Sequence, residues 1–150
     1  MVFGVSKETI TPSFPVKIAC NGRYNDGSIG IHDDVFCRCL MMDDGNQKLI
    51  FLSYDPLFHD REPNNTLADY EQQKNGVTPS SFVHSCTHAH TAPACRGYNP
   101  NHHSDLYEAY LVEKGKLCID KTMYSLFEET LEYVTVEIFR NCSPRWTKPA

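Results

Sequence analysis

Two histidines separated by one residue, His88 and His90, are the side chains whose types and spacing best suit chemistry. They follow a short apolar segment and precede Pro93, so the sequence predicts that they lie at the end of a strand. In an extended backbone, residues i and i+2 point to the same side, and the two imidazoles would then be directed at one point. Such a pair could hold a divalent metal such as zinc, or combine a metal ligand with a proton-transferring imidazole. The alternative is a pair of surface histidines in a turn, because the motif is short.

Two charged residues within or beside apolar runs are further candidates. Arg38 interrupts the run 34–42, where an unpaired buried charge would be costly, so it needs an anionic partner or an exposed strand end. A role in the site and a strand-end ion pair are both open for it. Asp55 ends the run 47–55, where its carboxylate could serve a site or cap the following turn. We take Arg38 and Asp55, together with His90, as the candidate catalytic residues.

The elements that must position these residues begin with strands. Residues 2–10 predict a first strand. The runs 34–42 and 47–55 flank Asp43-Asp-Gly-Asn46, a hairpin turn signal, and are therefore expected to pair antiparallel. If the run 34–42 is a strand, one of its faces carries Phe36, Arg38, Leu40 and Met42. Residues 82–87 predict the strand that leads into the histidine pair.

Two helices are predicted between and after these strands. Residues 64–74 predict a short helix with Asn64 or Asn65 as its N-cap and Asn75-Gly76 at its end. Ser104 is the expected N-cap of a long helix, in which apolar positions recur at steps of three and four from 106 to 131 and Gly115 weakens the middle.

A last strand is predicted at 132–140, where Val134, Val136 and Ile138 alternate. The segment 96–103 reads as a loop in which His102 and His103 are exposed. The order of strands and helices predicts an α/β fold, with a mixed β-sheet and flanking helices in a single domain over residues 1–150.

Composition limits the function classes. The 150 residues suffice for one domain, and the net charge of -5, with no basic stripe, argues against a nucleic-acid partner. No apolar run reaches the roughly 18 residues of a membrane span, and the first residues read as a strand and not as a secretion signal. Seven cysteines without a C-x-x-C pair disfavour a structural zinc ribbon and predict reduced, mostly buried thiols. The expected compartment is the cytoplasm.

Six short stretches in the same order resemble the N-terminal region of the neutral/alkaline non-lysosomal ceramidase family. The family's final signature, Thr-His-Thr-His-Ser-Gly-Pro, is matched by Thr87-His-Ala-His-Thr-Ala-Pro93. The stretches before it are Glu8-Thr-Ile-Thr-Pro12, Gly30-Ile-His-Asp33, Cys37-Arg-Cys39, Asp43-Asp-Gly45 and Ser53-Tyr-Asp55. The resemblance covers roughly residues 1 to 95, and it implies zinc-dependent hydrolysis of an amide bond in ceramide or related N-acyl compounds. It also implies that His88 is a zinc ligand and that His90 lies near the attacking group.

The chain also departs from that family. Thr91 and Ala92 replace Ser and Gly in the signature, which a backbone needing a positive φ at that point would not tolerate well. The family's other zinc ligands and its serine segment lie beyond this length, so the resemblance implies a truncated or divergent member. A catalytic zinc takes three protein ligands, and His88 could be joined here by His90, His32 or Asp55.

Two functions follow as alternatives. One is a zinc-dependent amide hydrolase acting on a small-molecule N-acyl substrate. The other is a non-catalytic fragment that binds a metal or a partner through an exposed sheet edge. If apolar surface is left uncovered, the chain is expected to self-associate, so a homo-oligomer is possible.

Overall fold

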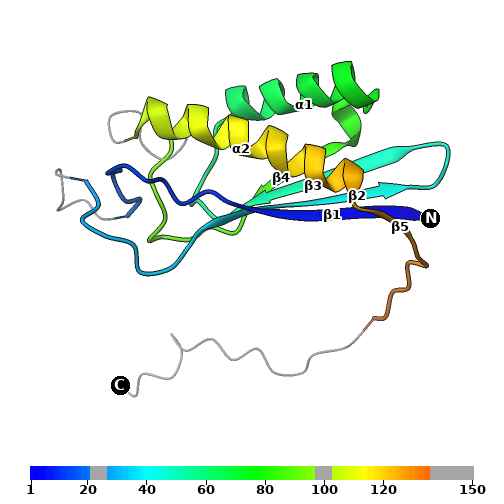
Figure 1. Cartoon of the computed structure of the whole chain (residues 1–150), viewed down its shortest axis with the longest axis horizontal. Helices are drawn as coiled ribbons and strands as arrows, with labels where there is room; N and C mark the ends of the chain where they lie inside the picture. Colours follow the sequence, from blue (N-terminus) through cyan, green and yellow to red (C-terminus); the bar gives the residue numbers. More distant parts are fainter. Residues whose placement is uncertain (21–26, 97–102, 136–150) are drawn as a thin grey trace.

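The computed structural model describes residues 1–20, 27–96 and 103–135. Two helices lie side by side on one face of a five-stranded sheet (Figure 1). The elements, in chain order, are β1 (Val2–Thr9), β2 (Phe36–Asp43), β3 (Lys48–Tyr54), α1 (Arg61–Asn75), the 3-10 turn η1 (Pro79–Ser81), β4 (Phe82–Cys86), α2 (Asp105–Tyr124) and β5 (Leu126–Glu128).

The sheet is mixed, with the strand order β4-β3-β2-β1-β5. Strands β3 and β4 run parallel, whereas the β2–β3, β1–β2 and β1–β5 pairs are antiparallel. The predicted hairpin joins β2 to β3, and its turn is held by two carboxylates: Asp43 accepts the N–H of Gly45, and Asp44 accepts those of Asn46 and Gln47. The predicted fold class, an α/β fold with a mixed sheet and flanking helices, is confirmed.

The main core lies between the sheet and the helices. In β2 the burial alternates as predicted: Cys37, Cys39 and Met41 are buried beneath α2, and the residues between them occupy the opposite face. Tyr54 at the end of β3 is fully buried and donates a hydrogen bond from its hydroxyl to the Leu111 carbonyl of α2, at 3.2 Å. The six cysteines in the described part of the chain are free thiols, of which Cys37, Cys39, Cys95 and Cys118 are buried, as the sequence predicted for most of them.

Helix α1 begins earlier than the sequence predicted. Its N-cap is Asp60, whose carboxylate accepts the N–H of Arg61 at 2.6 Å, and not Asn64 or Asn65. Pro63 lies in the first turn, where its missing N–H has no intrahelical partner to lose. The predicted end is confirmed, because Gly76 adopts a left-handed conformation with φ of 68°.

The long helix α2 starts as predicted but ends sooner. Ser104 caps it by accepting the N–H of Tyr107 at 3.3 Å. The helical pattern predicted as far as residue 131 is wrong beyond Tyr124, because Leu126–Glu128 form β5 instead and pair with Val2–Gly4 of β1. Ser125 fixes the change of direction by donating to the Val5 carbonyl and accepting the Val5 N–H.

The strand predicted at 132–140 is not formed by residues 132–135, and residues 136–140 lie outside the described part of the chain. Neither of the two helices within the described ranges has the length and apolarity needed to cross a lipid bilayer.

Candidate functional site

The loop that follows β4 carries the histidine pair, and hydrogen bonds from the end of β3 hold it in place. The N–H of Thr87 donates to the Tyr54 carbonyl at 2.8 Å, and the N–H of Ala89 donates to the Asp55 carbonyl at 3.1 Å. The strand itself ends at Cys86, and His88 has a φ of 69°, in the left-handed region. The pleat of a strand therefore does not align His88 with His90, and that part of the prediction is wrong.

The two rings nevertheless lie next to each other. Their centroids are 5.2 Å apart in an edge-on arrangement, with an interplanar angle of 70°. The His88 ring donates from Nδ1 to the Leu57 carbonyl oxygen at 2.9 Å, and the edge-on ring of Phe58 packs beside it at 4.9 Å. A neutral imidazole that donates through Nδ1 keeps an unprotonated Nε2, which is the nitrogen that can bind a metal.

The substitutions in the signature have a structural explanation. Ala92 is buried, and its N–H donates to the Ala89 carbonyl at 3.3 Å. Among the non-glycine residues described, only Cys20 and His88 have a positive φ. The strained position of this loop is therefore His88, and position 92 does not require glycine.

Asp55 ties together three segments around the loop. Its carboxylate accepts the N–H of Phe36 at 2.7 Å, a guanidinium N–H of Arg38 at 2.7 Å, and the hydroxyl of Thr87 at 3.2 Å. The anionic partner expected for Arg38 is thus Asp55, which lies next to Phe36 and Thr87 in the same network. The two candidate catalytic charges are placed where they hold the start of the histidine loop against β2 and β3.

The contacts of Asp55 lead to a stability prediction. We expect Asp55→Ala to lower the free energy of unfolding by about 2 kcal/mol, because a backbone N–H and a guanidinium lose their acceptor. Urea denaturation measures this loss. Asp33→Ala is the matched control, since the exposed Asp33 carboxylate pairs with the equally exposed His32, and it should change stability by less than about 0.5 kcal/mol. Equal stability of both variants would contradict the anchoring role.

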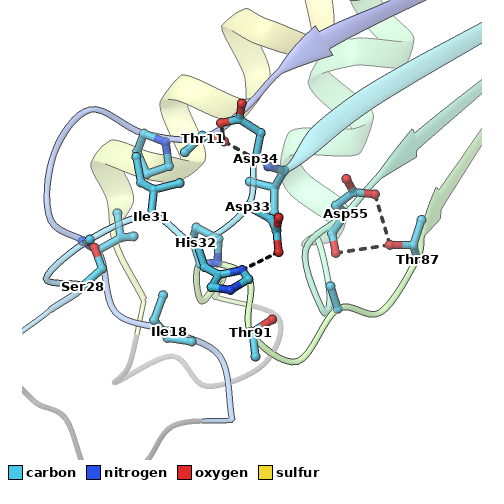
Figure 2. A pocket seen from close by; sticks show the side chains of 16 residues that line it. Thr11, Ile18, Ser28, Ile31, His32, Asp33, Asp34, Asp55, Thr87 and Thr91 are labelled. Atoms are coloured by element: carbon cyan, nitrogen blue, oxygen red, sulfur yellow. Dashed lines mark hydrogen bonds and ion pairs between the residues drawn. The ribbon is translucent and has the colours of Figure 1, made fainter.

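The structure places His32 in an exposed position. Its side chain is 98% exposed, and Nδ1 lies 2.6 Å from the carboxylate of Asp33. His32 lines a pocket of about 520 Å³, whose lining also includes Asp55, Thr87 and Thr91 but neither His88 nor His90. Figure 2 shows His32 among these residues. Within the described ranges, no group of three or more His, Cys, Asp or Glu residues is arranged to hold a metal ion.

A second histidine pair was not singled out from the sequence. His59 Nδ1 lies 2.8 Å from Asn64 Oδ1 and 3.1 Å from His84 Nε2, and both rings pack against Tyr54. Burial lowers the pKa of His84 to about 3, with a further contribution from His59, and burial also lowers the pKa of His59. The sequence did contain a signal for the position of His84, because side chains alternate between the two faces of a strand. In β4, His84 is on the same face as Phe82 and Cys86, which pack against the core.

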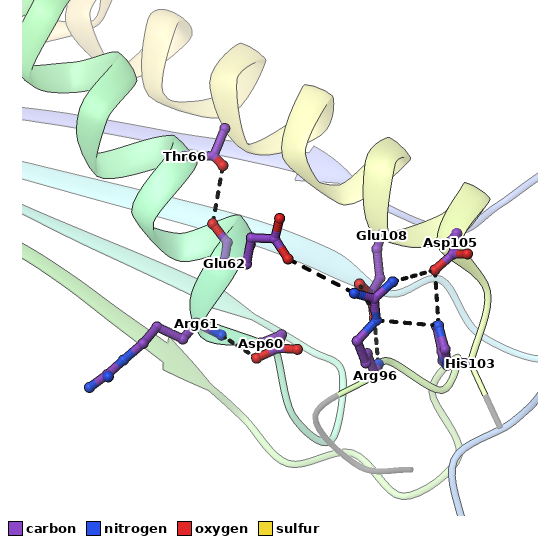
Figure 3. A network of polar contacts seen from close by, with 8 residues as sticks. All are labelled: Asp60, Arg61, Glu62, Thr66, Arg96, His103, Asp105 and Glu108. Atoms are coloured by element: carbon purple, nitrogen blue, oxygen red, sulfur yellow. Dashed lines mark hydrogen bonds and ion pairs between the residues drawn. The ribbon is translucent and has the colours of Figure 1, made fainter. Parts of the chain in front are cut away.

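A polar network anchors both ends of the segment 97–102, which itself lies outside the described residues (Figure 3). Arg96 donates to the Asp105 carboxylate at 2.6 Å, its N–H donates to Glu108, and its guanidinium lowers the pKa of Asp105. His103 lies 2.9 Å from the same carboxylate and is only 15% exposed, so the predicted exposure of His103 is wrong. His102 lies outside the described residues.

Comparisons with known proteins identify a fold. No family model and no curated protein matches the sequence. Among solved structures, the neutral ceramidase from Pseudomonas aeruginosa matches with a TM-score of 0.72 and 17% identity over 83% of this chain and 22% of that chain. A ceramidase complexed with C2 matches with a TM-score of 0.68 and 16% identity over 83% of this chain and 21% of that chain. The chain spans about one fifth of the length of these structures. It therefore has the fold of a part of neutral ceramidase, which confirms at the level of the fold the resemblance found in the sequence.

Proposed function

We propose that the chain is part of a zinc-dependent hydrolase of amide bonds in N-acyl compounds, with His88 as a zinc ligand and His90 beside it. The observation that carries this proposal is the hydrogen bond from His88 Nδ1 to the Leu57 carbonyl. Metal-binding histidines typically donate their second ring nitrogen to a carbonyl or carboxylate, which fixes the tautomer and the ring orientation. The neighbouring ring of His90, 5.2 Å away, supplies a second nitrogen of the same type.

The residue types fit part of a zinc site. Zinc, when bound, lowers the pKa of a coordinated water and polarises a carbonyl group, which is the chemistry that amide hydrolysis needs. His90 is exposed, and its imidazole could transfer a proton or serve as the second ligand. Asp55 and Arg38 act as positioning residues in this proposal, because their ion pair holds the loop that carries both rings.

The donor set is incomplete within the described residues. A catalytic zinc takes three protein ligands, and His32 lines a pocket that does not include the two rings. We therefore propose a site whose third ligand is not among the described residues. The N-acyl substrate rests on the likeness to the solved ceramidases.

The alternative function is a non-catalytic part that binds a metal or a partner. The observation in its favour is that the described residues offer two imidazoles where catalysis needs three ligands. Two protein ligands can hold zinc weakly, but they do not complete the site in which zinc activates a water. The two functions differ in whether N-acyl hydrolysis accompanies zinc binding and stops when a chelator removes the zinc.

Zinc binding is the first prediction to test. Titrating the metal-free chain with zinc in competition with a chromogenic chelator should give one site, and His88→Ala should weaken it at least about tenfold. His90→Ala distinguishes a second ligand, which weakens binding to a similar degree, from a proton-transferring group, which leaves binding almost unchanged.

Two further variants make the zinc experiment specific. Thr91→Ala is the matched control, since it changes an exposed side chain of the same loop that is not a typical zinc ligand, and it should bind zinc like the wild type. His32→Ala should also leave the affinity unchanged. Equal affinity of the wild type and His88→Ala would remove the assignment.

A further inference from the structure

The face of the sheet opposite the helices is apolar across its width. Pairing aligns Val5 with Leu40, Leu40 with Phe51, and Phe51 with Val83, so one row of apolar side chains crosses β1, β2, β3 and β4. We call this the central row. A second apolar row beside it consists of Phe127, Phe3, Met42 and Leu49. On the other side of the central row lies a polar row of Lys7, Arg38, Ser53 and Ser85.

The central row is accessible in the described part of the chain, whereas Phe3 in the second row is buried and Met42 and Leu49 are half-buried. Val5 is 50% exposed, and Phe51 and Val83 are each 37% exposed. Helices α1 and α2 both lie on the other side of the sheet (Figure 1). A sheet with one solvated face normally alternates apolar and polar residues, whereas β2 and β3 are nearly continuous apolar runs, as strands covered on both faces are.

We infer that this face is a self-association surface, on which a second copy of the chain packs sheet against sheet. The size of the face suits this partner. The five strands have 8, 8, 7, 5 and 3 residues, and at about 3.4 Å per residue and about 4.8 Å between strands they give an area of about 500 Å². Two such faces would bury about 1,000 Å² in total, which is the size of a weak interface.

The arrangement of the rows suits a twofold axis. An axis through the central row places it against itself, since the same patch meets itself in a twofold dimer. The polar row of each copy then lies over the second apolar row of the other copy. Lys7 and Arg38 of one copy are therefore separated from those of the other copy by the central row. Their aliphatic stems can cover Met42 and Leu49 while the Lys7 ammonium group reaches water and the Arg38 guanidinium keeps its ion pair with Asp55. Sheets packed in this way cross at about -30° or about 90°.

Sedimentation velocity of the full chain, from about 2 to about 200 μM, tests the inference, because an interface of this size is expected to give a micromolar dimer. Phe51→Glu should raise the dissociation constant at least about tenfold, since two unpaired carboxylates would be buried in the interface. Leu117→Glu is the matched control: it adds the same charge at an exposed apolar position of α2 and should dimerise like the wild type.

Additional measurements separate this surface from other contacts. Val83→Lys repeats the test at the next position of the central row, and circular dichroism checks that each variant is folded. A wild type that stays monomeric at about 200 μM would overturn the inference, as would a dimer that survives both Phe51→Glu and Val83→Lys. Association that EDTA abolishes would also overturn the inference, since a metal would then bridge the two copies. A monomer that binds phosphatidylcholine vesicles through this face would overturn it as well.

Discussion

Lowering the pH from 6.5 to 4 is expected to reduce the free energy of unfolding by about 3 kcal/mol through His84 alone. The pKa of His84 is about 3 in the folded chain, against an ordinary value of 6.5. Between these values the unfolded chain binds a proton that the folded chain does not, so acid favours unfolding. The stabilisation is complete above pH 6.5 and is lost progressively as the pH falls toward 3.

The pKa of His84 is low because its ring is buried. His84 is packed against Tyr54, and its Nε2 lies 3.1 Å from the Nδ1 of His59, which carries no negative charge. A proton on both rings would place two cations side by side with little water around them. The carboxylate of Asp60 favours a charged His59, which burial opposes more strongly.

Urea denaturation at several pH values measures this effect. The variant His84→Gln should flatten the dependence on pH between 6.5 and 4 by about 3 kcal/mol relative to the wild type. His32→Gln provides the control, because the exposed His32 should leave the profile unchanged. A wild type and a His84→Gln variant with parallel profiles would show that the folded chain does not lower the pKa of His84.

Gly115→Ala is expected to destabilise the chain by about 2 kcal/mol, although alanine is the better helix former. A Cβ at residue 115 would lie 2.1 Å from the hydroxyl of Tyr54 and 3.1 Å from both methyl groups of Leu67. Both side chains are fully buried, so they cannot move into solvent. The helix propensity gained is about 1 kcal/mol, whereas overpacking costs about 1–3 kcal/mol and displacing Tyr54 also breaks its bond to Leu111.

A double-mutant cycle tests this cause. Tyr54→Phe removes the hydroxyl, so Gly115→Ala should cost at least about 1 kcal/mol less in the Tyr54→Phe background than in the wild type. Gly30→Ala is the matched control, because a Cβ there meets no atom within 4 Å, and its stability should differ little from that of the wild type. A stabilising Gly115→Ala would mean that Tyr54 and α2 are not in contact as described.

The local features of the fold could be predicted because short-range interactions specify them. The turn at Asp43–Asn46 is closed by bonds within four residues, and Gly76 ends α1 through its own left-handed backbone. Ser104 caps α2 by accepting the N–H of Tyr107, which is three residues later in the sequence. Alternation in β2 likewise assigned residues to the correct faces, since a side-chain period of two follows from the extended backbone itself.

The candidate site was predicted only in part. The pairing of Arg38 with an anion followed from the cost of an isolated charge, but only the fold identifies the partner as Asp55. His88 and His90 were expected to be neighbours for a reason that does not apply, because the strand ends before them. Their rings meet through the left-handed conformation at His88 and its bond to Leu57, a residue 31 positions away.

What the sequence by itself determined is therefore the strands β1 to β4, the two helices, the hairpin, the caps at Gly76 and Ser104, and the residue types expected of a zinc site. Tertiary structure alone decided where α2 ends, because β5 gains hydrogen bonds to β1 that helical residues would not make. It also decided that His84 and His103 are covered and that His32 is not. These outcomes depend on contacts between distant segments, whose energies no local pattern contains.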